Sequence, residues 1–97
     1  MPAFVFGIVQ SVSNPAKFAE YQEFGLPSLD PYGGKIVGGG RVVEIADGDW
    51  SPEAVMAVEF ETLAKAKECY KSKEYQAVIS RRFDSSVSGV VFVEGSF

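Results

Sequence analysis

The chain has 97 residues and a formal net charge of −4, with 9 Lys and Arg against 13 Asp and Glu. This length suits one compact domain, so residues 1–97 are predicted to form a single domain. The acidic balance gives none of the basic surface that nucleic acids or anionic membranes attract, so neither is an expected partner. The chain has no histidine, which excludes a Ser-His-Asp triad and removes the commonest ligand of metals and haem. We therefore expect no cofactor and no metal site.

Cysteine usage and the N-terminal sequence both favour a cytoplasmic location. Cys69 is the single cysteine and cannot form an intrachain disulfide, as suits a reducing compartment. The apolar stretch from Ala3 to Val9 has no basic segment before it and no small-residue cleavage pattern after it, so it is predicted to be a strand and not a signal peptide. No stretch approaches the length of a membrane-spanning helix.

The first half of the chain predicts a strand, a helix and a second strand. Residues 3–10 are rich in β-formers, and apolar side chains fall on both faces of the strand. Asn14 followed by Pro15 is a typical helix start, and the helix is expected to end or kink near Gly25, before two prolines. After a glycine turn, segments 35–37 and 41–46 are predicted to form a strand with a flexible or bulged middle at residues 38–40.

The second half predicts a strand, broken helical segments and a last strand. Residues 55–60 form the next strand. Thr62 is expected to cap one helix and Ser72 another, which gives a second helical region broken near Lys71 and Ser72. Residues 90–94 are the last strand. The order β-α-β-β-α-β is that of the ferredoxin-like α+β fold, with one four-stranded antiparallel sheet.

The strands carry apolar residues on both faces, although helices can cover only one. An antiparallel sheet with one face in water should alternate apolar and polar residues. The chain has no further segment to cover the second face, so we expect a second copy to cover it. The predicted assembly is a homodimer with two sheets forming an α+β barrel.

Several motifs resemble those of the domain of unknown function 1330 (DUF1330) family, whose members belong to the dimeric α+β-barrel superfamily. They include Tyr32-Gly33-Gly34, Gly48-Asp49-Trp50, the segment Ser72 to Gln76, and Val93-Glu94-Gly95. The sequence departs from the family at Gly39, where an arginine is common, and at Glu53 and Ala54, where basic residues are common; Arg41 lies near the first of these positions. Superfamily relatives, among them monooxygenases and isomerases, use a pocket between sheet and helices, so the resemblance implies such a pocket here.

Glu59 is the candidate catalytic residue. It interrupts an apolar strand and shares a face with Val55 and Ala57, so a covered face would desolvate its carboxyl group and favour general acid or base chemistry. The structural alternative is a carboxylate near a strand end, paired with a cation or a backbone amide.

The candidate ligand-binding residues are aromatic or cationic. An indole or phenol offers a polar atom on an apolar body, and a guanidinium binds a carboxylate through two hydrogen bonds. Packing in the core is the alternative for the tyrosines, and a solvated surface is the default for the adjacent Arg81 and Arg82, of which at most one should face inward. Cys69 is expected to be a packing residue. The predicted ligand-binding set is Trp50, Tyr21, Tyr32, Arg41, Tyr70 and Tyr75.

The sequence thus predicts a cytoplasmic homodimeric barrel that binds a small organic metabolite in a pocket lined by Trp50, Glu59 and tyrosines. Cofactor-free acid–base chemistry, of the kind that an isomerase or a monooxygenase performs, is one interpretation. The alternative is a non-catalytic binding or assembly module whose apolar sheet face serves only to dimerise.

Overall fold

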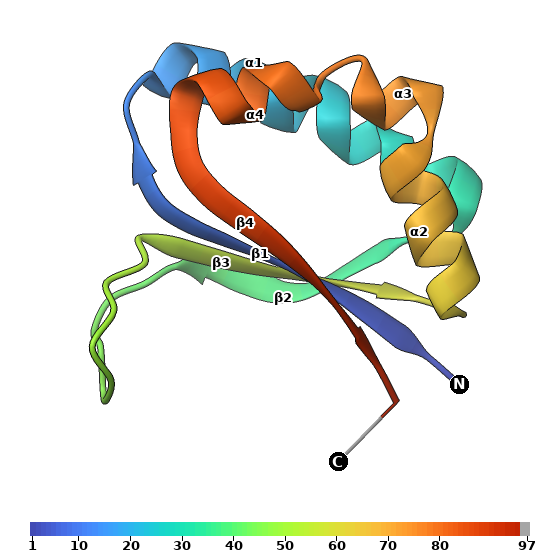
Figure 1. Cartoon of the computed structure of the whole chain (residues 1–97), viewed down its shortest axis with the longest axis horizontal. Helices are drawn as coiled ribbons and strands as arrows, with labels where there is room; N and C mark the ends of the chain where they lie inside the picture. The colour runs from blue at the N-terminus through green and yellow to red at the C-terminus, as the bar shows by residue number, and fades with distance from the viewer. Residues whose placement is uncertain (96–97) are drawn as a thin grey trace.

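The computed structural model describes residues 1–95 and has the predicted order of strands and helices (Figure 1). The sheet is antiparallel throughout, with strand order β2-β3-β1-β4. This is the ferredoxin-like arrangement, so the predicted fold class is confirmed. The elements are β1 Ala3–Val12, α1 Pro15–Gly25, the 3-10 helix η1 Leu26–Tyr32, β2 Lys35–Arg41, β3 Ala54–Phe60, α2 Leu63–Lys71, α3 Lys73–Gln76, α4 Ile79–Ser85 and β4 Ser86–Glu94.

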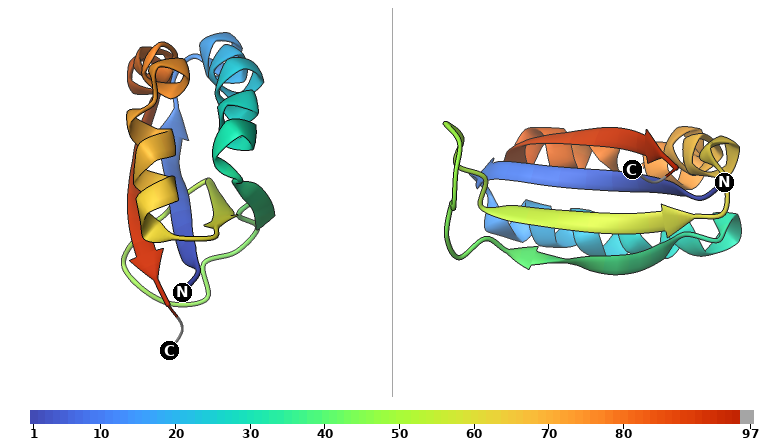
Figure 2. Two further views of the ribbon diagram at one scale, coloured as in Figure 1. Left: turned by 90° about the vertical axis from the view of Figure 1, so that its right-hand side faces the viewer. Right: turned by 90° about the horizontal axis from the view of Figure 1, so that it is seen from below.

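The helices form one layer on one face of the sheet. Helices α1 and α4 lie side by side above the sheet, and α2 closes one end, as the views in Figures 1 and 2 show. In the part of the chain that the structure describes, no helix lies on the opposite face of the sheet (Figure 2). Within residues 1–95, no helix is long and apolar enough to cross a membrane.

Helix boundaries follow local capping chemistry. The Asn14 side-chain oxygen accepts a hydrogen bond from the Lys17 backbone N–H at 3.1 Å, and Pro15 occupies the first turn, as predicted. Helix α1 ends at Gly25, where the chain continues as η1 until Gly33, whose φ of 76° suits glycine. Thr62 and Ser72 cap α2 and α3 by the same mechanism. The predicted helix starts are therefore confirmed.

Strand β2 has the predicted bulge but a different end. Its register against β3 shifts between Ile36 and Gly38, and the strand stops at Arg41 and does not continue to residue 46. The last contact of the pair is Val42 N–H donating to the Glu53 carbonyl at 2.8 Å. Beyond it, residues 43–46 pair with no strand of the described chain, and Pro52 on the returning side has no N–H to donate.

Strand β4 is longer than predicted because it pairs along the whole of β1. It begins at Ser86, opposite Val12, and not at Val90. Serine and glycine at the start of this segment are weak β-formers, so the strand character there comes from pairing with β1.

The core lies between the sheet and the end of the helix layer closed by α2. Phe60 of β3 is 2% exposed and clusters with Val58, Ala66 and Cys69. The backbone of Gly34 passes directly over the Phe60 ring, where a Cβ atom would come within 2.8 Å of the ring carbon Cζ. This close approach is one reason for glycine at the turn into β2.

Candidate functional site

A cavity of about 460 Å³ lies between the helix layer and the face of the sheet that the helices cover. Its size is within the range of pockets for small organic ligands. Apolar side chains from the sheet and from the helices α1 and η1 form most of the lining, among them Val5, Phe18, Leu29, Met56, Val90 and Phe92. The few polar groups in the lining therefore decide which ligand chemistry the cavity accepts.

Arg82 of α4 is a buried cation in this lining. The residue is only 4% exposed, and its Nη1 donates a hydrogen bond to the Ser88 Oγ of β4 at 2.9 Å. Its guanidinium carbon lies 4.8 Å from the centre of the Phe83 ring and 6.0 Å from that of Tyr21. Its Nε is buried and has no hydrogen-bond partner among residues 1–95. A buried donor without a partner is costly to a fold.

Tyr21 and Tyr75 form a hydrogen-bonded pair in the same lining, with 2.7 Å between their hydroxyl oxygens. Burial raises the pKa of Tyr21 well above its ordinary value, and Tyr75 beside it raises that pKa further, while Arg82 acts in the opposite direction. Two hydroxyl groups that share one hydrogen bond use one hydrogen and keep the other. The pair therefore retains one O–H that is available to a ligand.

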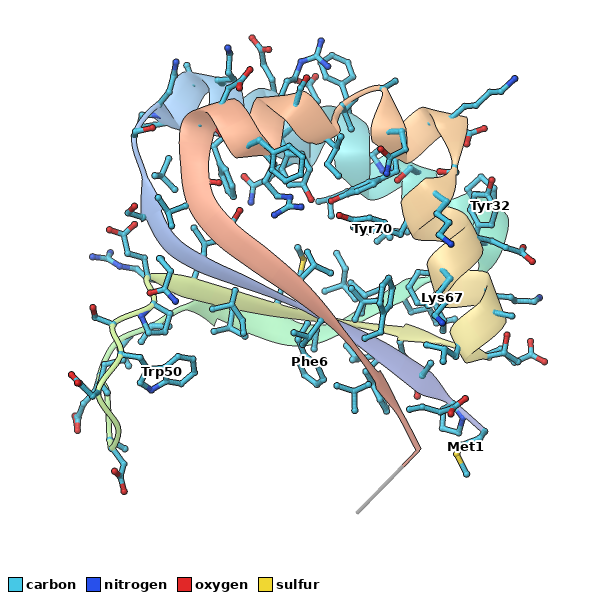
Figure 3. The ribbon with its side chains drawn as sticks, viewed as in Figure 1. Met1, Phe6, Tyr32, Trp50, Lys67 and Tyr70 are labelled. Atoms are coloured by element: carbon cyan, nitrogen blue, oxygen red, sulfur yellow. The ribbon has the colours of Figure 1, made fainter. Side chains whose placement is uncertain are left out.

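Tyr70 and Cys69, both from α2, also line the cavity. The Tyr70 ring lies 5.3 Å from that of Tyr75 and 5.8 Å, edge on, from that of Phe92, and Figure 3 shows it between the helix layer and the sheet. The Cys69 thiol donates to the Ser28 carbonyl at 3.4 Å. Burial raises the pKa of this thiol, against the opposing effect of the Ser28 contact, so the group favours its neutral form.

The structure brings together four of the six predicted ligand-binding residues. Tyr21, Arg41, Tyr70 and Tyr75 line the cavity, with Arg41 exposed at the end of β2. Tyr32 does not line it, because its side chain packs against the core cluster beside α2 (Figure 3).

Trp50 lies apart from the cavity between the helices and the sheet, in the loop between β2 and β3 (Figure 3). Its indole N–H donates to the Asp47 carbonyl at 3.3 Å, and half of the residue is exposed. It lines a separate hollow of about 270 Å³ formed largely by this loop.

Glu59 does not line the cavity between the helices and the sheet either. In β3, Met56, Val58 and Phe60 point toward the helices, so Glu59 points to the uncovered face. It lies opposite Phe4 of β1 and Lys35 of β2. The expectation of one pocket shared by Glu59, Trp50 and the tyrosines is therefore not met. The two-residue period of the strand turns Glu59 away from the cavity, and the loop between β2 and β3 holds Trp50 outside it.

Arg82 was missed as a site residue because a solvated surface is the default for helical arginines. The structure separates the adjacent pair: Arg81 bonds Glu20 on the surface at 3.3 Å, whereas Arg82 is buried. Adjacent helical residues point in different directions, and this was the available signal that one of the two should face inward.

The uncovered face of the sheet is mostly apolar, with Glu59 opposite Lys35 near one end. Phe4 and Phe6 of β1 lie side by side there, with 6.2 Å between ring centres, and Figure 3 shows Phe6 pointing away from the helices. Val91 and Val93 of β4, opposite Phe6 and Phe4, are 49% and 41% exposed. We call this surface the open face; it consists of Phe4, Phe6, Ile8, Val55, Ala57, Glu59, Val91 and Val93.

The fold and the cavity define a ferredoxin-like α+β domain, and solved structures share this arrangement over nearly the whole chain. A protein of unknown function from Rhodopseudomonas palustris is similar with a TM-score of 0.80 at 18% identity, covering 99% of this chain and 83% of that one. A dimeric ferredoxin-like protein of unknown function from Jannaschia sp. CCS1 gives 0.69 at 10% identity, covering 98% and 100%. SnoaB, a cofactor-independent oxygenase from Streptomyces nogalater, gives 0.66 at 12% identity, covering 99% and 93%.

The sequence profile of one family, "Domain of unknown function (DUF1330)", matches residues 2–96. The chain belongs to this family, as the motifs around Tyr32, Trp50 and Tyr75 predicted. A search of the curated proteins finds no significant match.

Proposed function

We propose that this protein is a homodimer in which each subunit binds a small organic molecule in the cavity between the sheet and the helices. The cavity itself carries the proposal: about 460 Å³ of mostly apolar lining into which the Tyr21–Tyr75 pair and Arg82 bring polar groups. A concave apolar site with a few convergent polar groups is the usual form of a ligand site.

The open face supports the dimer. Large apolar side chains left in water favour association, and a second copy of this sheet offers a matching apolar surface. The loop of residues 42–53 descends beyond the sheet on the side of the open face (Figure 1) and exposes Val43, Ile45 and Trp50, which would contact that copy. The similar protein from Jannaschia is dimeric, which is consistent with this assembly.

The tyrosine pair supports cofactor-free acid–base chemistry as the reaction type. A tyrosine with a raised pKa stays protonated at neutral pH, so the pair offers a hydroxyl donor to a ligand oxygen that gains negative charge. The fold is similar to that of SnoaB, a cofactor-independent oxygenase, which is consistent with a reaction that needs no cofactor.

Native mass spectrometry of the freshly purified protein tests assembly and ligand together. The expected result is a dimer that carries additional mass, released when the protein is denatured. A monomer at micromolar concentration would overturn the dimer. A dimer without additional mass that binds no small molecule in a screen would instead support a purely structural assembly module.

A further inference from the structure

We infer that the ligand of the cavity is a monocarboxylate with an apolar body, and that Arg82 binds its carboxylate group. This inference rests on the proposed function, because it names the class of molecule that the same cavity would hold. Two observations support it: the charged side chains in the cavity lining are positive, and the buried Nε of Arg82 has no hydrogen-bond partner within residues 1–95.

The charge of the cavity is opposite to that of the protein. The chain has 13 acidic residues against 9 basic ones, yet the charged side chains that line the cavity within residues 1–95 are Arg41 and Arg82, and no Asp or Glu joins them. An apolar enclosure that holds cations without carboxylates favours a negatively charged occupant.

Arg82 lacks the partner that a buried cation needs. Its residue is 4% exposed, and no carboxylate in the described part of the chain lies within 4 Å of its guanidinium nitrogens. Its hydrogen bond to Ser88 is to a neutral hydroxyl, and its Nε donates to no group of residues 1–95. Buried charges in proteins are normally paired, so a missing counter-charge inside a ligand cavity points to the ligand as its source.

The neighbouring groups complete a site for a planar anion. The free edge of a guanidinium offers parallel N–H donors that match the two oxygens of a carboxylate. The Arg82 guanidinium carbon is 6.0 Å from the centre of the Tyr21 ring, and the Tyr21–Tyr75 pair holds one unused O–H. The same corner of the cavity therefore supplies a charge and several donors.

The balance of charge and the lining together favour a carboxylate over a phosphate. One buried arginine offsets one negative charge, whereas a phosphate monoester carries up to two near neutral pH. The second arginine, Arg41, is exposed at the end of β2 and does not share the enclosed corner. The rest of the lining, including Val5, Met56 and Phe92, suits the apolar body of the ligand.

The test compares matched probes by ligand-observed NMR titration: phenylacetate, its neutral amide phenylacetamide, and phenyl phosphate. We expect phenylacetate to bind the wild-type protein at least tenfold more tightly than either of the others. In Arg82→Gln this preference over the amide should fall below twofold. The matched control is Arg81→Gln, which removes the neighbouring surface cation and its bond to Glu20 and should leave the preference unchanged.

A stability measurement separates this role from a structural one. Because Arg82 is a buried cation without a carboxylate, Arg82→Gln should unfold at an equal or higher temperature than the wild type, and phenylacetate should raise the unfolding temperature of the wild type only. Should Arg82→Gln fail to fold, Arg82→Lys keeps the charge without the two-donor edge and should lower the preference several-fold.

The outcomes distinguish the two proposals. Equal binding of phenylacetate and phenylacetamide, or an unchanged preference in Arg82→Gln, would overturn the carboxylate assignment and leave the cavity a ligand site. Tighter binding of phenyl phosphate would also overturn it, in favour of a phosphate ligand. Binding of none of the three probes, together with no retained mass, would overturn the proposed function and the inference with it.

Discussion

The two faces of the sheet are made from the same strands but differ in what covers them. On the helix side, Val5, Gly7 and Val9 of β1 face a hollow that the helices cover but do not fill. On the open face, Phe4, Phe6 and Ile8 of the same strand form an apolar surface that no helix within residues 1–95 covers. Along β1, small residues thus face the helices and large residues face outward, whereas β3 turns Met56, Val58 and Phe60 toward the helices.

This difference supports the proposal that one face of the sheet holds a ligand and the other contacts a second subunit. A core that served only for packing would fill the space beneath the helices, because interiors are normally filled to high density. Here a cavity of about 460 Å³ remains beside Arg82 and the two tyrosines, although Met56, Phe60 and Phe92 also point toward the helices. Phe4 and Phe6 lie on the other face, where a partner sheet would contact them. The contrast supports the proposed ligand binding on one face and the proposed assembly on the other.

A charge on the open face should give the largest effect. In Phe6→Asp, dimerisation should weaken by roughly 100-fold or more, since an unpaired carboxylate buried in an apolar interface costs several kcal/mol. Sedimentation velocity over a concentration series measures the shift toward monomer. The matched control is Phe24→Asp, because Phe24 of α1 is half-exposed on the helix layer and its replacement should leave the dimer intact. A Phe6→Asp dimer of wild-type affinity would show that the open face is not the interface.

Filling the helix side should abolish binding without loss of fold. A Cβ atom at Gly7 meets no atom within 4 Å, so Gly7→Phe should place a ring in the cavity and weaken ligand binding at least tenfold, as titration would measure. The urea midpoint should be maintained, because a glycine inside a strand is itself unfavourable.

The opposite face provides the control for this variant. Val91 of β4 lies opposite Phe6 of the open face, is 49% exposed and does not line the cavity within residues 1–95. Val91→Phe should therefore keep ligand binding while it alters the dimer affinity. If both variants lose the ligand equally, the separation of functions between the two faces is wrong.

The smallest expected effect is on stability at alkaline pH, and it concerns the helix side alone. The pKa of Tyr21 is raised in the folded state, so below about pH 10 both states keep the proton and stability is unaffected. As the pH rises above 10, the unfolded state loses the proton first, and the free energy of unfolding falls by about 1.4 kcal/mol per pH unit from this group. Tyr21→Phe should remove that part of the slope, measured by urea unfolding between about pH 9 and 11; an unchanged slope would contradict the burial of this hydroxyl.

Local sequence chemistry predicted the fold well because its signals are short-range. Asn14, Thr62 and Ser72 each cap the helix that follows them, and apolar strands without alternation correctly indicated a sheet with two apolar faces. The end of β2 and the start of β4 were misplaced, since pairing with a neighbouring strand decides both and is not visible in either segment.

The candidate site was predicted only in part because it depends on how distant segments meet. Tyr21 and Tyr75 are 54 positions apart in the chain and share a hydrogen bond, which no local pattern encodes. Arg82 was assigned to the surface by residue type, and only the packing of α4 against α1 and β4 buries it. For Glu59, the strand face was identified correctly, but which face the helices would cover was not.

The segregation of charge also has a kinetic consequence. An anion that approaches this protein is repelled at long range by the net charge of −4. Once it reaches the cavity, the arginines of the lining attract it at short range. Dissolved salt screens the long-range repulsion more than the attraction inside the cavity. The reason is that the Debye length shortens with ionic strength, and enclosed charge pairs are less exposed to ions. The association rate of an anionic ligand should then rise with salt concentration, the reverse of ordinary electrostatic steering. Arg41 at the end of β2 carries a positive charge at the cavity and should reduce the repulsion that the approaching anion meets.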